Sequence, residues 1–404
     1  MPVTSTTPPS ADLERRLRTY PWFVLAALVG AFAFTVLTAD GSTTQAGRLG
    51  GDFPAFYSAG SIVADGQVES LYELQTQAAA QADLLGAEDG FVMYPYAPHV
   101  AAAYAPLSQL SYTAAYVLHT TIMVAALVSA LWVLRPVIGI LDRRFVVALT
   151  AAVTAYPVFV GVMGGQNTAI SLLLVAAAWR AWHDDNDALA GLALAVLLFR
   201  PQYALPLIGL ALLDRRYRTV AVAALGAVGV WLANAAVAGA SWVTFWYDGV
   251  RPLLEADAEV NAVNEIAPIG VTVALFGETT FAVLLGGAVS AALVMGLMWL
   301  WWTRPADLTA RMAITAAALP LLGPHAIYYD AALLVFTVLV LIDRDKLTPL
   351  GAAAIWLATL VHVSRFALDV SPLILVIGAV LIVAGQRLVS GQAEADRVLP
   401  IHDS

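Results

Sequence analysis

The first side chain whose type and position could do chemistry is Asp52, in the segment GGDFPAFYSAG after the first long apolar run. A carboxylate beside an apolar helix and two glycines can approach a ligand closely and be partly desolvated. Desolvation raises the pKa of a carboxyl group and suits it to act as a general base. The alternative is a helix cap, because Asp is common directly before a helix. Tyr57, one turn further on, is either a packing residue or a surface for a sugar ring.

Arg200 is the second candidate, because it interrupts the apolar stretch from Ala188 to Leu213 and is followed by Pro201. A charge inside a membrane is costly, so its presence suggests a function. An arginine that faces a cavity open to the outside can bind a phosphate through two parallel hydrogen bonds. A structural ion pair with an acidic residue, or with free carbonyls at the break, is the alternative.

Three further segments carry polar side chains that could contact a ligand: residues 92–110, 164–170 and 323–334. Each also has a structural explanation, since Tyr and His are common at membrane interfaces, amides cap helices in tight turns, and an Asp near a helix start interacts favourably with the helix dipole. The candidates in these segments are Tyr94, His99, Gln166, Asn167, His325, Tyr329 and Asp330.

The sequence gives no sign of a metal or nucleotide site. It has no cysteine, and His119, His183, His362 and His402 have no metal-ligand spacing. We find no glycine-rich phosphate loop, and no DxD-type pair of carboxylates in the segments expected outside the membrane. We therefore expect neither metal nor cofactor. A group transfer on the outer face, where nucleotides are absent, would need a lipid-borne donor.

The composition requires a membrane to hold these residues. Of the 404 residues, 60% are hydrophobic and 12% charged, whereas soluble domains carry about 25% charged residues. This excludes a soluble enzyme, a nucleic-acid-binding protein and a disordered chain. Because the apolar runs are continuous and do not alternate, the protein is expected to be an all-α polytopic membrane protein.

About 20 apolar residues span a bilayer as a helix, and twelve runs approach that pattern. Twelve crossings place both chain ends in the cytoplasm. Of the 20 Lys and Arg residues, 16 then fall inside, and only Arg48, Arg200, Arg251 and Arg365 do not, in agreement with the positive-inside rule. The runs are Trp22–Thr38, Tyr112–Leu134, Phe145–Met163, Thr168–Trp182, Ala188–Phe199, Tyr203–Leu213, Arg218–Gly239, Phe281–Trp302, Thr309–Leu322, Ile327–Ile342, Leu347–His362 and Pro372–Leu388.

Two long segments remain outside, residues 39–111 and 240–280. The first contains a helix-like stretch, Leu71–Leu85, and the second a short apolar run, Ile266–Phe276. Because functional sites concentrate on loops held by a rigid scaffold, we expect the extracytoplasmic face to be the working face. The break at Arg200 lies within the membrane depth, where only protein or a water-filled cavity can cover the freed backbone.

Taken together, these segments resemble glycosyltransferase family 87, the polyprenyl-phosphate-mannose-dependent mannosyltransferases of the GT-C superfamily. Five motifs occur in the family's order, with two departures. Tyr96 stands where the family has the second proline of Tyr-Pro-Pro, and Arg200 stands where it has Lys. The motifs are Asp52 to Gly60, Tyr94-Pro95 with Pro106-Leu107, Gly165-Gln166-Asn167, Arg200-Pro201-Gln202 and Tyr328-Tyr329-Asp330.

The resemblance implies a GT-C fold and an inverting, metal-independent transfer of mannose. The donor would be a polyprenyl-phosphate sugar, and the acceptor a hydroxyl of a glycolipid or cell-envelope glycan. Asp52 would be the general base, and Arg200 would stabilise the departing lipid phosphate. The remaining substrate contacts would be Tyr57, Tyr94, His99, Gln166, Asn167, Gln202, His325, Tyr329 and Asp330.

This assignment predicts a cytoplasmic tail over residues 1–21, one transmembrane catalytic domain over 22–389 and a second cytoplasmic tail over 390–404. The expected location is the plasma membrane of a bacterium, with membrane lipids as surroundings and no nucleic-acid partner. Two alternatives stay open. One is a transporter or flippase of a lipid-linked sugar, which would explain a broken helix and an intramembrane Arg. The other is a transferase of the same fold with an arabinofuranosyl or other polyprenyl-phosphate donor.

Overall fold

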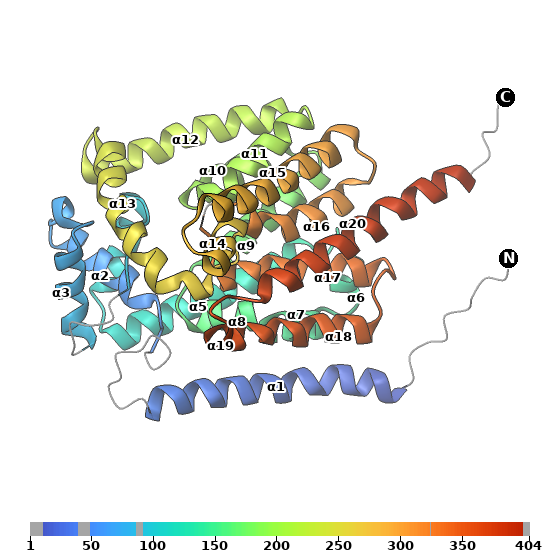
Figure 1. Ribbon diagram of the computed structural model, residues 1–404, viewed down its shortest axis with the longest axis horizontal. Coiled ribbons are helices and arrows are strands. Elements are labelled where there is room, and N and C mark those ends of the chain that lie inside the picture. Colours follow the sequence, from blue (N-terminus) through green and yellow to red (C-terminus); the bar gives the residue numbers. More distant parts are fainter. Residues whose placement is uncertain (1–10, 39–48, 86–91, 324, 399–404) are drawn as a thin grey trace.

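The computed structural model describes residues 11–38, 49–85, 92–323 and 325–398, and this part of the chain is built from α-helices and short 3-10 helices (Figure 1). Within these residues, β-type pairing is limited to one isolated bridge between Glu265 and Ile327. The expected all-α class is therefore confirmed. Residues 1–10 and 399–404 of the two expected tails, and Arg48, lie outside the described residues.

Each of the twelve apolar runs lies on helices. Among the described residues, five helices are individually long and apolar enough to cross a bilayer, and the number rises to six if the bent pair α7 (Phe145–Thr154) and α8 (Tyr156–Met163) is one span. The protein is thus a helical membrane protein. The five are α1 (Ala11–Thr38), α5 (Tyr112–Val133), α12 (Tyr217–Ala238), α15 (Thr280–Thr303), and α18 (Pro349–Ala358) with the turns that continue it to Leu368.

The other runs fall on helices whose apolar segments are too short to pass as spans by themselves, and most of them pack inside the bundle. They are α9 (Thr168–His183), α10 (Asp187–Val196) with η3 (Leu197–Phe199), α11 (Pro201–Leu213), α16 (Leu308–Ala318) with η5 (Leu319–Leu321), η6 (Tyr328–Leu333) with α17 (Leu334–Asp343), and α20 (Leu373–Val398). The largest side chains of this core, Trp179, Trp182 and Trp301, are fully buried around α9. The bundle therefore has a close-packed interior, which can hold polar groups at fixed positions.

The run Phe145–Met163, expected to be one span, is bent by 72° between α7 and α8. The residue between the two helices, Ala155, has an extended backbone (φ −63°, ψ 127°), and Pro157 follows in the first turn of α8. Proline cannot donate the helical hydrogen bond, and its ring clashes with the carbonyl four residues earlier. Hydropathy alone does not reveal this bend, because both halves are equally apolar.

Short helices gather at one end of the bundle (Figure 1, left). Phe53, Phe56 and Tyr94 are fully buried between them and form the centre of a second hydrophobic core. The expected helix over 71–85 is α3, and the apolar run over 266–276 is α14. Figure 1 shows α2 (Phe53–Ala64), α3 (Leu74–Leu85) and the longer α13 (Trp242–Asn261) at this end. Helix α4 (Pro98–Ser108) packs against α2, and α14 (Pro268–Phe276) lies nearer the middle, against α15.

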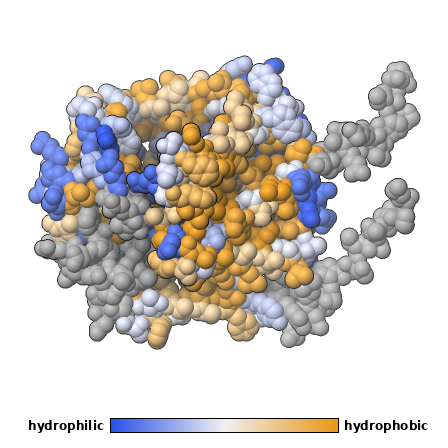
Figure 2. Space-filling model, in the orientation of Figure 1, coloured by the Kyte–Doolittle hydropathy of each residue, from blue (hydrophilic) through white to orange (hydrophobic). Residues whose placement is uncertain are grey.

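The surface agrees with a membrane environment. Figure 2 shows hydrophobic residues across the middle of the molecule and hydrophilic residues toward its two ends. On α15, Phe281, Leu284, Met295 and Trp302 are each more than 60% exposed. An apolar surface of this extent is unfavourable in water, because soluble proteins rarely expose large contiguous patches.

Candidate active site

A turn formed by Gly50 and Gly51 positions Asp52 at the end of the bundle. Gly50 and Gly51 have positive φ angles, and the Asp52 amide donates a hydrogen bond to the carbonyl of Gly164 (2.8 Å). The carboxylate is 6% exposed and accepts a 2.5 Å hydrogen bond from Nε2 of Gln166. It makes no capping hydrogen bond to α2, although it occupies the N-cap position. The structure thus directs this carboxylate to another loop and not to its own helix.

Gly165 explains how closely the two loops approach each other. Its φ is +76°, and a Cβ atom added there would lie 2.5 Å from Cβ of Phe53 and 2.8 Å from the carbonyl oxygen of Gly50. Only glycine fits both the left-handed backbone and this contact. The contact holds Gln166, the next residue, beside Asp52.

Arg200 lies at the expected break, between η3 and α11. Its backbone (φ −124°, ψ 78°) leaves the helix, and Pro201 begins the next one. The side chain is only 2% exposed and donates four hydrogen bonds inside the protein. Its partners are Oδ1 of Asp330 (2.6 Å), Oδ1 of Asn167 (3.0 Å), the hydroxyl of Tyr96 (3.2 Å) and Oε1 of Gln166 (3.4 Å).

Asp330 interacts with the start of its own helix, as the structural explanation expected, and is also the acidic partner of Arg200. One oxygen pairs with Arg200, and the other accepts a hydrogen bond from the Ile327 amide at the start of η6 (3.3 Å). The carboxylate is 3% exposed. The guanidinium and the backbone amide both bind this buried carboxylate, which offsets part of the cost of removing it from water.

The amide of Gln166 joins the two charged centres. Its nitrogen donates to Asp52, and its oxygen accepts from Arg200. This places a carboxylate and a guanidinium on opposite sides of one neutral side chain. Such an arrangement can take a proton at one end and stabilise negative charge at the other, which are the two needs of a displacement reaction.

Aromatic side chains surround the guanidinium. The rings of Tyr96, Tyr203 and Tyr329 lie 6.0, 5.9 and 5.9 Å from the Arg200 carbon Cζ. Tyr72 fixes the Tyr96 backbone by donating to its carbonyl oxygen (2.8 Å). Sequence reasoning treated Tyr96 only as a departure from a motif and missed Tyr203. The motif spacing could have suggested Tyr203, since it lies directly after Gln202.

Three expected ligand contacts are engaged in other interactions. The Tyr57 hydroxyl donates to the Leu110 carbonyl oxygen (2.7 Å), while Tyr94 is fully buried and its hydroxyl donates to the carbonyl oxygen of Ala97 (3.3 Å). His99 contacts Oδ1 of Asn234 in α12 through its amide (2.9 Å) and Nδ1 (3.0 Å), and burial lowers the pKa of its imidazole. None of these hydrogen bonds reaches Asp52 or Arg200.

His325 pairs with Glu265, a residue that the sequence analysis did not single out. The histidine Nδ1 contacts the glutamate carboxylate, whose other oxygen accepts from the Ala326 amide (3.3 Å). Gln202 packs beside Gly323 in the same region. The signal that was overlooked is a carboxylate directly before the apolar run that becomes α14.

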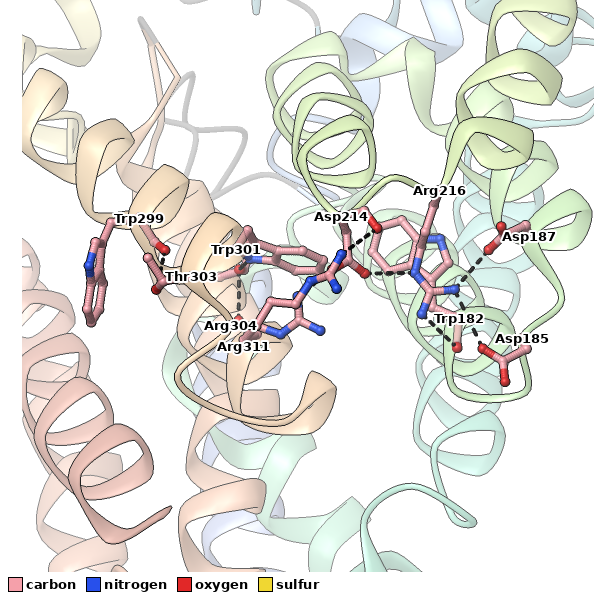
Figure 3. Close-up of polar contacts among 11 residues, drawn as sticks. Trp182, Asp185, Asp187, Asp214, Arg216, Trp299, Trp301, Thr303, Arg304 and Arg311 are labelled. Atoms are coloured by element: carbon pink, nitrogen blue, oxygen red, sulfur yellow. Dashed lines mark hydrogen bonds and ion pairs between the residues drawn. The ribbon is translucent and has the colours of Figure 1, made fainter. Parts of the chain in front are cut away.

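A second cluster of charged residues lies at the other end of α9. Asp214, after α11, is 6% exposed and binds Arg216 (3.0 Å), Arg304 (2.8 Å) and Arg311 (2.9 Å). Arg216 also pairs with Asp187 (2.8 Å), and the guanidinium of Arg311 lies 4.6 Å from the ring centre of Trp301 (Figure 3). These residues tie together the ends of α10, α11, α12, α15 and α16.

The sequence was also compared with known proteins. No curated protein and no solved structure matches it. The model of glycosyltransferase family 87 matches residues 94–324, more than half of the chain. This range includes Gln166, Asn167 and Arg200, while Asp52 and Asp330 lie outside it. The protein is therefore a membrane glycosyltransferase, and the chain belongs to glycosyltransferase family 87.

Proposed function

We propose that the protein transfers a sugar, with mannose as the expected one, from a polyprenyl phosphate to a hydroxyl of a glycolipid or cell-envelope glycan. The observation that carries this proposal is the position of one amide, Gln166, between the Asp52 carboxylate and the Arg200 guanidinium. A base and a cation so placed suit the two ends of a glycosyl transfer from a phosphate donor.

In this mechanism Asp52 accepts the proton of the acceptor hydroxyl. The hydroxyl oxygen forms a bond to the anomeric carbon of the sugar, and the bond from that carbon to the phosphate oxygen breaks. The electron pair stays on the phosphate, where Arg200 stabilises the developing charge. Attack on the face opposite the leaving group inverts the anomeric centre. Because Arg200 supplies the positive charge, we propose that the reaction is metal-independent.

Donor binding has to exchange contacts of Arg200, because the side chain is 2% exposed. The hydrogen bonds of the Nη2 atom are the easiest to exchange for bonds to a donor phosphate. Its partners, the Tyr96 hydroxyl and the Gln166 amide oxygen, are neutral and lie 3.2 and 3.4 Å away, whereas Nη1 holds the charged Asp330 at 2.6 Å. A phosphate oxygen would replace the two weaker bonds and leave the ion pair intact. Asn167, Tyr329, His325 and Gln202 are proposed as further sugar or phosphate contacts, and Tyr57, Tyr94 and His99 as more distant ones.

We further propose a GT-C fold with twelve membrane crossings, a catalytic domain over residues 22–389 and cytoplasmic tails over 1–21 and 390–404. The N-terminal end of α1 and the C-terminal end of α20 both point to the end of the molecule where α6 (Gly139–Arg143) lies, which supports a common side for them (Figure 1). The site would then face the outside of a bacterial plasma membrane. An arabinofuranosyl donor is compatible with the same phosphate contacts.

The second candidate is a flippase of a lipid-linked sugar. The helix break at Arg200 and the 72° bend between α7 and α8 favour it, because transporters place binding sites at broken helices. The two functions differ in whether a glycosidic bond is made. Reconstituted protein that moves the lipid across liposomes, with no acceptor glycosylated, would support the flippase.

The test of the transferase uses membranes supplied with radiolabelled polyprenyl-phosphate-mannose and extracted glycolipids. Asp52→Asn should lower transfer by roughly 10²- to 10⁴-fold, because the base is lost. The matched control is Asp65→Asn, an exposed carboxylate just after α2. Near-normal turnover in Asp52→Asn, with both variants folded and inserted equally, would remove Asp52 from the role of base.

A further inference from the structure

A cavity of about 680 Å³ lies where α5 ends, beside α6 and the last turns of α9. Its lining includes Arg135, Arg143 and Arg180, one carboxylate, Asp142, and the indole of Trp132. We propose that this cavity binds the phosphate group of an anionic membrane lipid. The cavity has no part in the transfer reaction described above, and its occupancy can be measured without any turnover.

The cavity is far from the Asp52–Arg200 site. The Tyr116 hydroxyl near the start of α5 donates to the carbonyl oxygen of Met163, just before the turn that contacts Asp52. Trp132 lies sixteen residues further along the same helix, which is about 24 Å at 1.5 Å per residue. A phosphate in this cavity would therefore be a second molecule and not the sugar donor.

The three arginines have hydrogen-bond donors to spare. Arg143 pairs with Asp343 through Nη2 (2.9 Å) and Arg180 with Asp184 through Nε (2.7 Å), and neither of these carboxylates lines the cavity. A guanidinium has five N–H groups, so a single pairing leaves donors for a phosphate. Each of the three arginines is paired with one carboxylate, but only one of these carboxylates, Asp142, lines the cavity, so the unused N–H groups and not a net charge would bind the phosphate.

Arg135 carries the most specific sign of a missing partner. Its Nη2 binds Asp142 (2.6 Å), but its Nε atom is buried and has no hydrogen-bond partner among the described residues. Its guanidinium carbon lies 4.2 Å from the ring centre of Trp132. A buried N–H without an acceptor is costly, and a phosphate oxygen could satisfy it.

The position of the cavity favours a lipid as the source of the phosphate. Trp132 is 57% exposed at the end of a helix long enough to cross the bilayer. Exposed Trp at a helix end is typical of the level of lipid headgroups, and basic pockets between membrane helices bind anionic headgroups. A soluble phosphate has the same acceptor chemistry, so the test must separate the two sources.

The test uses the full-length protein purified in detergent and examined by native mass spectrometry and thermal unfolding. Phosphatidylglycerol, phosphatidylcholine and inorganic phosphate are titrated separately. We expect phosphatidylglycerol to stay bound and to raise the melting temperature, whereas phosphatidylcholine and inorganic phosphate at the same concentration should not. An equal shift with inorganic phosphate would overturn the lipid as the source, and no selectivity for either anion would overturn the site.

The variant is the double substitution Arg135→Gln with Arg180→Gln, which should weaken phosphatidylglycerol binding by at least roughly tenfold. The matched control is Arg218→Gln, an exposed arginine at the start of α12 that does not line the cavity. If the double variant is too unstable, Arg135→Lys with Arg180→Lys keeps the charge and should retain most of the selectivity. Wild-type affinity in the Gln variant at full folding would refute the proposal.

Discussion

The protein holds two buried charge clusters at opposite ends of α9, and their partners differ in kind. In the Asp214 cluster one carboxylate binds three arginines, so the contacts that define the cluster join opposite charges. In the Asp52–Arg200 network the guanidinium contacts one carboxylate and three neutral groups, and an amide links it to Asp52. Ion pairs are hard to exchange in a low dielectric, whereas neutral partners can yield to a charged ligand. The comparison separates a cluster that holds helices together from one that can accept a substrate.

Among the substitutions that test this comparison of the two clusters, Arg200→Met is expected to have the largest effect on transfer. Loss of the cation that stabilises the leaving phosphate should reduce turnover by roughly 10²- to 10³-fold. Donor use should fall far more than acceptor affinity, which initial-rate kinetics with each substrate varied in turn can separate.

The control for this prediction is Arg200→Lys. It keeps the charge and the approximate reach but loses the planar fork, so it should retain more activity than the Met variant. Equal effects of Arg200→Met on donor and acceptor would mean that Arg200 is structural, and the two clusters would then not differ as described.

The second prediction concerns Asp214→Asn, which should affect stability and not turnover. The substitution leaves Arg311, 8% exposed, and two further arginines without their shared carboxylate. Removing one partner of a buried ion pair costs about 3 kcal/mol or more of unfolding free energy. Thermal unfolding in detergent measures this loss, and the rate per folded molecule should stay at the wild-type level.

Glu255→Gln provides the comparison for Asp214→Asn, because Glu255 belongs to an exposed pair with Arg251. We expect no measurable change in the melting temperature of this variant. A drop in turnover at unchanged stability in Asp214→Asn would assign the cluster a functional role.

The smallest effect is expected for Gln166→Ala, which removes the link between the two charged centres. Asp52 and Arg200 both remain, so turnover should fall by roughly tenfold to a hundredfold through loss of positioning. The amide donates to the Asp52 carboxylate, and the initial rate of transfer per folded molecule measures the effect of removing this contact.

The control is Gln81→Ala, since Gln81 is a fully buried amide that pairs with the Val92 backbone through both its nitrogen (2.7 Å) and its oxygen (2.8 Å). It should lower the melting temperature and leave the rate of transfer per folded molecule at the wild-type level. A wild-type rate for Gln166→Ala would show that the two charged residues do not depend on the amide.

Much of the fold was predictable because membrane helices carry their signal locally. The twelve apolar runs all lie on helices, and the break at Arg200 was visible from one charge followed by one proline. The bend at Ala155 was missed, since Pro157 lies within a run whose hydropathy does not change. The Asp214 cluster was missed because the cations around it were read only as markers of one membrane face.

The site was only partly predictable, because its contacts join segments far apart in sequence. The motifs indicated Asp52, Gln166, Asn167, Arg200 and Asp330 as site residues. They did not indicate which of these side chains form hydrogen bonds with one another. Tyr96 and Glu265 become visible only once the fold brings Tyr96 to Arg200 and Glu265 to His325. Single-sequence patterns contain no information on such long-range pairings.

The contact at Gly165 has a further consequence for how substitutions in this protein should be interpreted. Since a single methyl group there would collide with Phe53 and Gly50, an alanine would push the loop of Asp52 away from the loop of Gln166. Such a variant would lose activity without any change in charge. The spacing of the reactive groups therefore depends on the absence of one carbon atom at Gly165, because neighbouring atoms already fill the space that a side chain would need.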